Sequence, residues 1–148
     1  MKVIANNKKA TYDYDIKLKI NSGLVLTGSE VKSLRVNSSS IKEAYVAEKN
    51  GELWLCNCHI KRYHSSSDKV NDPIRQRKLL ISKKELNKLL GSVKKDGFSI
   101  IPLSIYFNEN GLVKLNIGLG RGKKKYDKRQ SQKLKDWNKS KERLLKNN

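Results

Sequence analysis

The chain has 148 residues, the usual size of one domain, and its 36% of hydrophobic residues is enough for one modest core. Lys and Arg total 33 against 14 Asp and Glu, which gives a net charge of +19. Charge of one sign at this density repels itself and lowers folding stability, so it indicates a polyanionic partner, most commonly nucleic acid. A surface tuned only for solubility is a weaker alternative. An anionic membrane is weaker too, because no amphipathic anchor or lipidation motif is present.

Two features of the sequence place the protein in a reducing compartment. Cys56 and Cys58 are too few for a disulfide framework. The apolar run from Val3 to Ala5 is too short for a signal-peptide core, and no stretch is long enough to span a membrane. We therefore expect a cytoplasmic protein with no membrane partner.

The positive charge is uneven along the chain. Residues 121–148 contain 12 basic and three acidic residues, a net charge of +9, and the first 120 residues carry the remaining +10. A glycine-containing segment at Gly120–Gly122 separates the two parts. The sequence therefore predicts a folded body over residues 1–120 and a basic tail over residues 121–148.

The body begins with a predicted strand. From Tyr12 to Ile20 every even position is apolar and every odd position is polar, a period typical of a half-buried strand. The segment Asn21-Ser22-Gly23 interrupts this pattern and predicts a bulge or bend before the apolar residues 24–26.

Short helices and hairpins are predicted next. A helix over residues 28–35 would face Val31 and Leu34 inward. The apolar segments 44–47 and 53–60 flank an Asn-Gly turn, which predicts a β-hairpin. Residues 61–72 contain three consecutive serines and predict a mobile loop.

The second half of the body contains a helix and another hairpin. Ser82 and Glu85 have the spacing of a capping box, apolar residues follow at helical spacing to Val93, and Gly97 suits the C-terminal cap. The segments 98–107 and 113–119 flank an Asn-Gly turn and predict the second hairpin.

These elements together predict a mainly β fold. About five strands and one or two added helices fit a small antiparallel barrel of the oligonucleotide-binding (OB) type, with the basic tail attached. An SH3-like barrel is the nearest alternative, because pattern alone does not fix strand order.

Two motifs invite a catalytic or cofactor interpretation. Cys56, Cys58 and His59 lie close together, but a closed zinc site needs four ligands and the only other histidine is His64. The glycines of residues 118–122 do not form a phosphate loop, because Lys124 stands where Ser or Thr must bind magnesium. We expect no metal, cofactor or catalytic residue. A metal-free nuclease using both histidines is the enzyme alternative.

Three basic clusters in the body are candidate RNA-binding sites. In extended backbone, Arg75 and Arg77 point the same way and predict a pair of forks for phosphates. The alternative for any one cluster is an ordinary solvated face. The candidate residues are Lys9, Lys32, Arg35, Arg75, Arg77 and Lys78.

The tail has features of a nucleic-acid ligand. Tyr126 lies inside a basic run, where an aromatic ring can stack on an unpaired base, the alternative being a solvated aromatic. Wound as a helix, the tail gathers Leu134, Trp137, Leu144 and Leu145 on one side, with Lys133 and other cations elsewhere. Like-charge repulsion predicts that the tail is disordered alone and folds on binding.

Four blocks resemble the small protein B family, in the family's order. They are Asn7-Lys8-Lys9-Ala10, Gly28 to Arg35, Asp72-Pro73 with Arg75 to Leu80, and Gly122-Lys123-Lys124 with Asp127-Lys128-Arg129. The resemblance runs from about Asn7 to the end. It implies an OB-like barrel that binds the tRNA-like domain of transfer-messenger RNA. It also implies a tail that becomes helical in the decoding centre and mRNA channel of the ribosome.

The implied function is ribosome rescue by trans-translation. The protein would deliver transfer-messenger RNA to stalled ribosomes, so that the nascent chain is tagged for degradation. We expect a monomer with no covalent chemistry of its own. The alternatives are a general ribosomal or RNA-chaperone OB protein and a small ribonuclease.

The resemblance also implies roles for particular residues. Leu80 and Lys114 match positions used against the tRNA-like domain, whereas Asn21 stands where many members have a glutamate that contributes to RNA binding. Tyr126 stands where relatives often have histidine, and Leu144 and Leu145 match apolar tail positions. The motif needed for accommodation and tagging is matched by Gly122, Lys123, Lys124, Asp127, Lys128 and Arg129.

Overall fold

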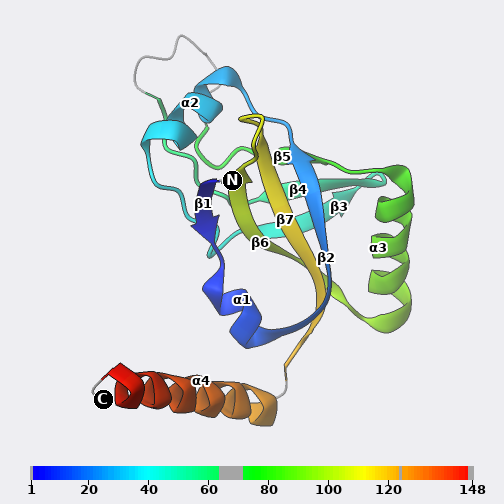
Figure 1. Cartoon of the computed structure of the whole chain (residues 1–148). Coiled ribbons are helices and arrows are strands. Elements are labelled where there is room, and N and C mark those ends of the chain that lie inside the picture. Colours follow the sequence, from blue (N-terminus) through cyan, green and yellow to red (C-terminus); the bar gives the residue numbers. More distant parts are fainter. Residues whose placement is uncertain (1, 64–71, 124, 147–148) are drawn as a thin grey trace.

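Seven antiparallel strands form one curved sheet in the computed structural model (Figure 1), which describes residues 2–63, 72–123 and 125–146. Across the sheet the strands run in the order β1-β6-β7-β2-β5-β4-β3. The strands are β1 (Lys2–Asn6), β2 (Tyr14–Leu24), β3 (Tyr45–Lys49), β4 (Glu52–Cys56), β5 (Arg77–Leu80), β6 (Ser99–Phe107) and β7 (Val113–Gly122). The helices are α1 (Lys8–Asp13), α2 (Gly28–Val36), α3 (Lys83–Asp96) and α4 (Lys125–Lys146). The prediction of a mainly β, antiparallel fold is confirmed.

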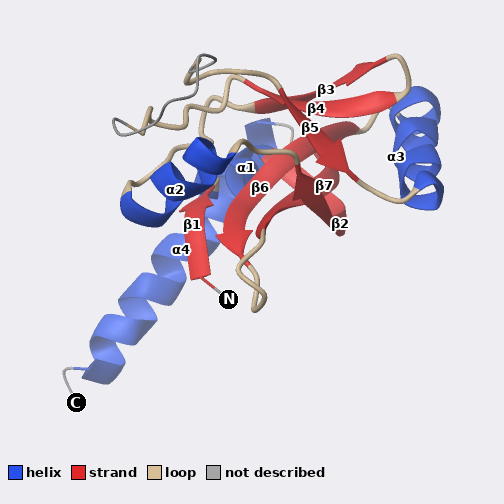
Figure 2. Ribbon diagram, turned by 90° about the horizontal axis from the view of Figure 1, so that it is seen from above, coloured by secondary structure: helices blue, strands red, loops and turns tan. Residues whose placement is uncertain are grey.

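The core lies inside the curve of the sheet, with β2, β6 and β7 on one side and β3, β4 and β5 on the other (Figure 2). Ile20 and Leu24 of β2 point into it, and so do Leu115 and Ile117 of β7. Because side chains alternate along a strand, the odd-numbered residues at this end of β2 and the even-numbered residues of β7 lie on the outer face.

The sheet does not close into the predicted barrel. β1 and β3 end the strand order, and within the described residues no strand pairing joins them. β3 approaches β6 beside a cavity of about 510 Å3, which α1 and α3 also line. The closed barrel was wrong because β3 has only five residues, and β1 rather than β3 pairs with the outer edge of β6.

The first 24 residues differ from the prediction in two ways. Lys8–Asp13 form helix α1, whose first turn is capped by the Asn7 side chain, so β2 begins at Tyr14 rather than Tyr12. β2 then continues unbroken to Leu24 and pairs with β7 as far as Gly23, and the buried Ser22 hydroxyl donates a hydrogen bond to the Leu115 carbonyl at 2.9 Å. The irregularity in its pairing with β7 lies between Ile16 and Leu18 instead.

The local signals for hairpins and helices are confirmed. Asn50 and Gly51 both have positive φ, 53° and 78°, as a two-residue turn between β3 and β4 requires. The second hairpin joins β6 to β7. Ser82 caps α3 and Gly97 ends it in the left-handed conformation. The predicted loop over residues 61–72 falls largely on residues 64–71, outside the described part.

The tail is a helix in this structure, and Figure 2 shows α4 extending away from the sheet. β7 continues to Gly122, two residues beyond the predicted boundary of the body. α4 touches the protein at α1, where the Lys135 ammonium lies 6.0 Å from the centre of the Tyr12 ring. The tail's disorder when alone stays a prediction. None of the described helices is both long and apolar enough to cross a membrane.

Candidate nucleic-acid interface

The outer face of the sheet brings Leu80 and Lys114 together. In the strand register, Gly23 of β2 lies opposite Leu80 of β5 on one side and opposite Lys114 of β7 on the other. Leu80 is 52% exposed although it follows the buried Leu79. The two residues are 34 positions apart in the sequence, and in the sheet only one strand, β2, lies between them.

The surface between these two side chains is shallow because Gly23 has no side chain. A Cβ at this position would lie 3.0 Å from the Leu80 Cβ, closer than ordinary packing allows. The absence of a side chain leaves bare backbone between an apolar group and an ammonium group. Such a shallow site can receive a ribose or an unpaired base on Leu80 while Lys114 contacts a phosphate.

Polar side chains continue this outer face. Asn21 of β2 lies opposite Asn116 of β7, and Asn116 lies opposite Ser104 of β6. Asn21 is exposed, so its amide can donate and accept hydrogen bonds. An RNA contact at position 21 stays a prediction.

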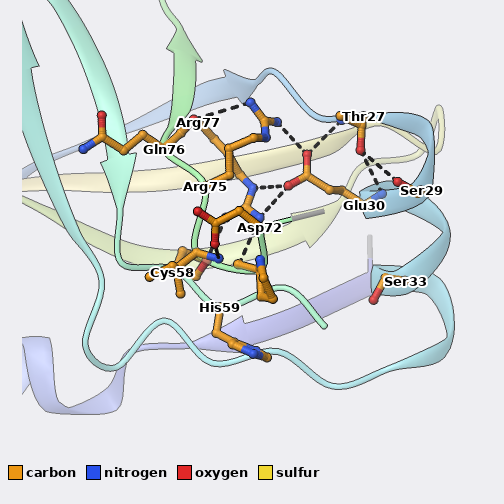
Figure 3. Close-up of polar contacts among 12 residues, drawn as sticks. Thr27, Ser29, Glu30, Ser33, Cys58, His59, Asp72, Arg75, Gln76 and Arg77 are labelled. Atoms are coloured by element: carbon orange, nitrogen blue, oxygen red, sulfur yellow. Dashed lines mark hydrogen bonds and ion pairs between the residues drawn. The ribbon is translucent and has the colours of Figure 1, made fainter. Parts of the chain in front are cut away.

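A largely buried ionic network lies between α2 and the segment that leads into β5 (Figure 3). Glu30 belongs to a capping box in which its carboxylate accepts from the Thr27 N–H at 2.9 Å. The carboxylate also accepts from Arg75 Nη2 at 2.6 Å and from Arg77 Nε at 2.5 Å. Arg77 further donates to the carbonyls of Cys58, at 2.7 Å, and Pro73, at 3.1 Å.

This network corrects the expected phosphate forks of Arg75 and Arg77. Both guanidinium groups point the same way, but toward Glu30, and the Arg77 side chain is completely buried. Burial alone would raise the pKa of Glu30, but hydrogen bonds from Arg75, the Thr27 N–H and Arg77 outweigh it and lower that pKa. In this structure Arg77 therefore holds the loop before β5 against α2 and presents no donors to solvent.

The remaining basic candidates lie on separate elements and are fully or partly exposed. Lys9 lies on α1, whereas Lys32 and Arg35 lie on α2. Lys78 of β5 pairs with Glu52 of the neighbouring strand at 3.1 Å, with both side chains partly exposed. The RNA contacts of these residues stay predictions.

Lys123 anchors the start of the tail to the body. Its backbone N–H donates to the Asp13 carbonyl at 2.8 Å, and its ammonium donates to the Thr11 carbonyl at 3.1 Å. Carbonyls at a helix C-terminus favour a cation, so the contact fits the end of α1. Gly122 pairs with Tyr14, the first residue of β2.

The tail candidates lie on α4 or just before it. Lys124 and the side chains of Tyr126, Asp127 and Lys128 lie outside the described part of the structure. The exposed tail candidates are Arg129, Lys133, Trp137, Leu144 and Leu145. Trp137 is 67% exposed, so the apolar side of α4 faces solvent in the described structure.

The structure describes both cysteines and one of the two histidines. Cys56 and Cys58 are buried free thiols, and burial raises the pKa of Cys58 to about 11, so it is protonated at neutral pH. Within residues 2–63, 72–123 and 125–146, no group of three potential ligands is close enough to hold a metal. His59 is exposed beside Ser40, and His64 lies outside the described residues.

Gly23 was missed as a member of this site because it was assigned to a bulge. Its odd position in the alternating pattern of β2 was the available signal, since the odd positions were predicted to be polar and outward. The fully buried state of Arg77 had no local signal, because its acidic partner Glu30 lies 47 residues away.

The chain is similar to known proteins over nearly its whole length. The family model for SmpB protein matches residues 4–147. The SsrA-binding protein of Ehrlichia canis is 52% identical over 148 residues, covering 100% of both chains. That of a Wolbachia species from Brugia malayi is 53% identical, covering 100% of this chain and 99% of the relative.

A solved structure agrees with these relatives. A chain from "tmRNA-SmpB: a journey to the center of the bacterial ribosome" has a TM-score of 0.66 and 42% identity, covering 84% of this chain and 87% of that chain. The family match spans the outer face, the buried network and the tail. This chain belongs to the SmpB protein family.

Proposed function

We propose that this chain is the protein partner of transfer-messenger RNA in trans-translation. It binds the tRNA-like domain of that RNA and delivers it to ribosomes stalled on messages without a stop codon. The nascent chain is then tagged for degradation. The observation that carries this proposal is the family match over residues 4–147, joined to a solved relative that is a tmRNA–SmpB structure of the bacterial ribosome.

The outer face supplies the RNA contact in this proposal. Leu80 offers an apolar surface and Lys114 offers an ammonium group. Gly23, which has no side chain, lies between them. Folded RNA exposes its backbone, its 2′-hydroxyl groups and unpaired loop bases, which are features that such a mixed surface can bind. The curved antiparallel sheet that carries the face supports the OB-type description.

The tail acts separately from the sheet. Its cations attract RNA over long range. Its apolar side, which includes the exposed Trp137, is buried only when a binding partner covers it. We infer that α4 enters the decoding centre and the vacant mRNA channel, where phosphates neutralise its lysines. The protein contributes binding and placement, with no catalytic step of its own, and acts as a cytoplasmic monomer.

A reconstituted tagging reaction tests this function. Purified ribosomes stalled on a message without a stop codon are combined with charged transfer-messenger RNA, with and without the protein. The proposal expects tagged nascent chains only when the protein is present. Equal tagging in both reactions would show that the protein is not required for this step.

A further inference from the structure

A stripe of lysines runs along α3, outside the candidate face described above. Lys84, Lys88 and Lys95 are exposed, and at 3.6 residues per turn they fall within about 40° of one another around the helix. The opposite side of α3 packs on the core. That side consists of Leu86, Leu89, Leu90 and Val93. The lysine stripe therefore faces solvent along the length of the helix.

Gly91 lies within this stripe, between Lys88 and Lys95. A Cβ at Gly91 would meet no atom within 4 Å, so no packing inside the protein requires a glycine there. Glycine in a helix interior lowers helix stability relative to alanine. A missing side chain among the lysines opens the helix backbone to close approach by another molecule.

The placement of Lys84 also lowers the stability of α3. Lys84 and Lys88 are like charges four residues apart, and Lys84 lies in the first turn, where the helix dipole disfavours a cation. Elsewhere, Lys17 pairs with Asp15 at 2.9 Å. Within the part of the chain that the structure describes, no carboxylate forms an ion pair with Lys84, Lys88 or Lys95. A polyanion would relieve both costs.

We propose that this stripe is a docking surface for the phosphate backbone of transfer-messenger RNA, with the backbone passing over Gly91. The proposal rests on the proposed function. α3 begins three residues after Leu80 and lies beyond β2, on the side of the sheet away from α2 and β1 (Figures 1 and 2). An RNA seated on the outer face continues onto this helix. Lysines act there as point charges, so the contact carries no sequence preference.

Gly91→Ala tests the close approach. Alanine favours the helix, so the melting temperature of the full-length protein rises. The added methyl group holds the RNA backbone away, so affinity for the tRNA-like domain of transfer-messenger RNA falls. A higher melting temperature with unchanged affinity contradicts the proposal.

A charge-matched pair of variants tests the lysines. Lys88→Gln with Lys95→Gln removes two charges from the stripe, and Lys83→Gln with Lys94→Gln removes two exposed charges from the flank of the same helix. The stripe variant loses affinity for the tRNA-like domain, and its salt slope becomes less steep by about two. The flank variant keeps most of its affinity and slope.

The other outcomes identify which idea fails. Equal losses in both variants mean a general charge effect and overturn the docking surface. A loss confined to binding of vacant ribosomes, with the tRNA-like domain bound normally, makes ribosomal RNA the occupant and overturns it too. In either case the wild-type preference for transfer-messenger RNA over bulk tRNA shows whether the proposed function itself still stands.

Discussion

Arg77 and Glu30 form an ion pair inside the protein, with Arg77 Nη2 2.5 Å from Glu30 Oε2 and the arginine side chain fully buried. The pair joins the first turn of α2 to the first residue of β5. Leu80 is the last residue of that strand. The pair therefore fixes the strand that presents Leu80 on the outer face.

Glu30→Gln should strongly destabilise the protein. The substitution removes the negative charge that compensates a buried guanidinium, and breaking a buried pair typically costs about 3–5 kcal/mol. Urea unfolding followed by circular dichroism measures this loss. Asp15→Asn is the control, because Asp15 pairs with Lys17 in an exposed ion pair and should change stability little. Equal stability of the Glu30→Gln and wild-type proteins would show that the network is not needed for folding.

The same ion pair makes the free energy of unfolding decrease at acidic pH. The pKa of Glu30 lies below its usual range in the folded protein, so the folded state holds this group ionised where the unfolded chain begins to take up a proton. Its contribution is complete above the usual glutamate pKa, about 4.3, and is lost as pH falls through the lower folded value. Unfolding at several pH values should show a shallower acid loss in Glu30→Gln than in the wild type.

Leu80→Ala and Lys114→Ala should each weaken RNA binding while changing the melting temperature little. Leu80 is more than half exposed, and Lys114 lies on the outer face, so neither truncation opens a cavity in the core. We expect a loss of affinity of about tenfold, or about 1.4 kcal/mol, for each. Lys42→Ala, at an exposed site before β3, is the control. Unchanged affinity in both test variants would remove the outer face from the RNA interface.

Removal of the tail should separate binding from tagging. The chain ending at Lys124 keeps β7 intact, including Arg121, whose guanidinium lies 4.6 Å from the centre of the Phe98 ring. This truncated protein should bind the tRNA-like domain nearly as well as the full chain but give no tagged product on stalled ribosomes. Normal tagging by the truncated protein would contradict the role of α4. A chain ending at Gly120 would also lose part of β7 and should melt at a lower temperature.

Local patterns predicted the elements whose signals are contained in a few neighbouring residues. Turn chemistry marked both hairpins, and capping chemistry marked α3 at Ser82 and Gly97. α1 was missed because six residues are too few to show a helical period, and the preceding strand pattern overlapped it. The pairing of β1 with β6 joins segments about 100 residues apart, and only packing of the whole chain decides it.

Only part of the candidate site was predictable from the sequence. Leu80 and Lys114 came from family resemblance, whereas the position of Gly23 between them is a matter of register. Arg75 and Arg77 have the composition of a phosphate site, and the glutamate that takes up their hydrogen bonds belongs to a different element. Charge density indicated a polyanionic partner but no particular RNA, because composition contains no information on the shape of the binding surface.

Competition binding tests the central claim most directly. The labelled tRNA-like domain of transfer-messenger RNA is bound to the full-length protein at physiological salt, and unlabelled bulk tRNA is added in increasing excess. If the protein is the dedicated partner of that RNA, the labelled complex survives a large excess of tRNA and is displaced by its own unlabelled form. Displacement by bulk tRNA at equal concentration would mean a general RNA-binding protein and contradict the proposed function.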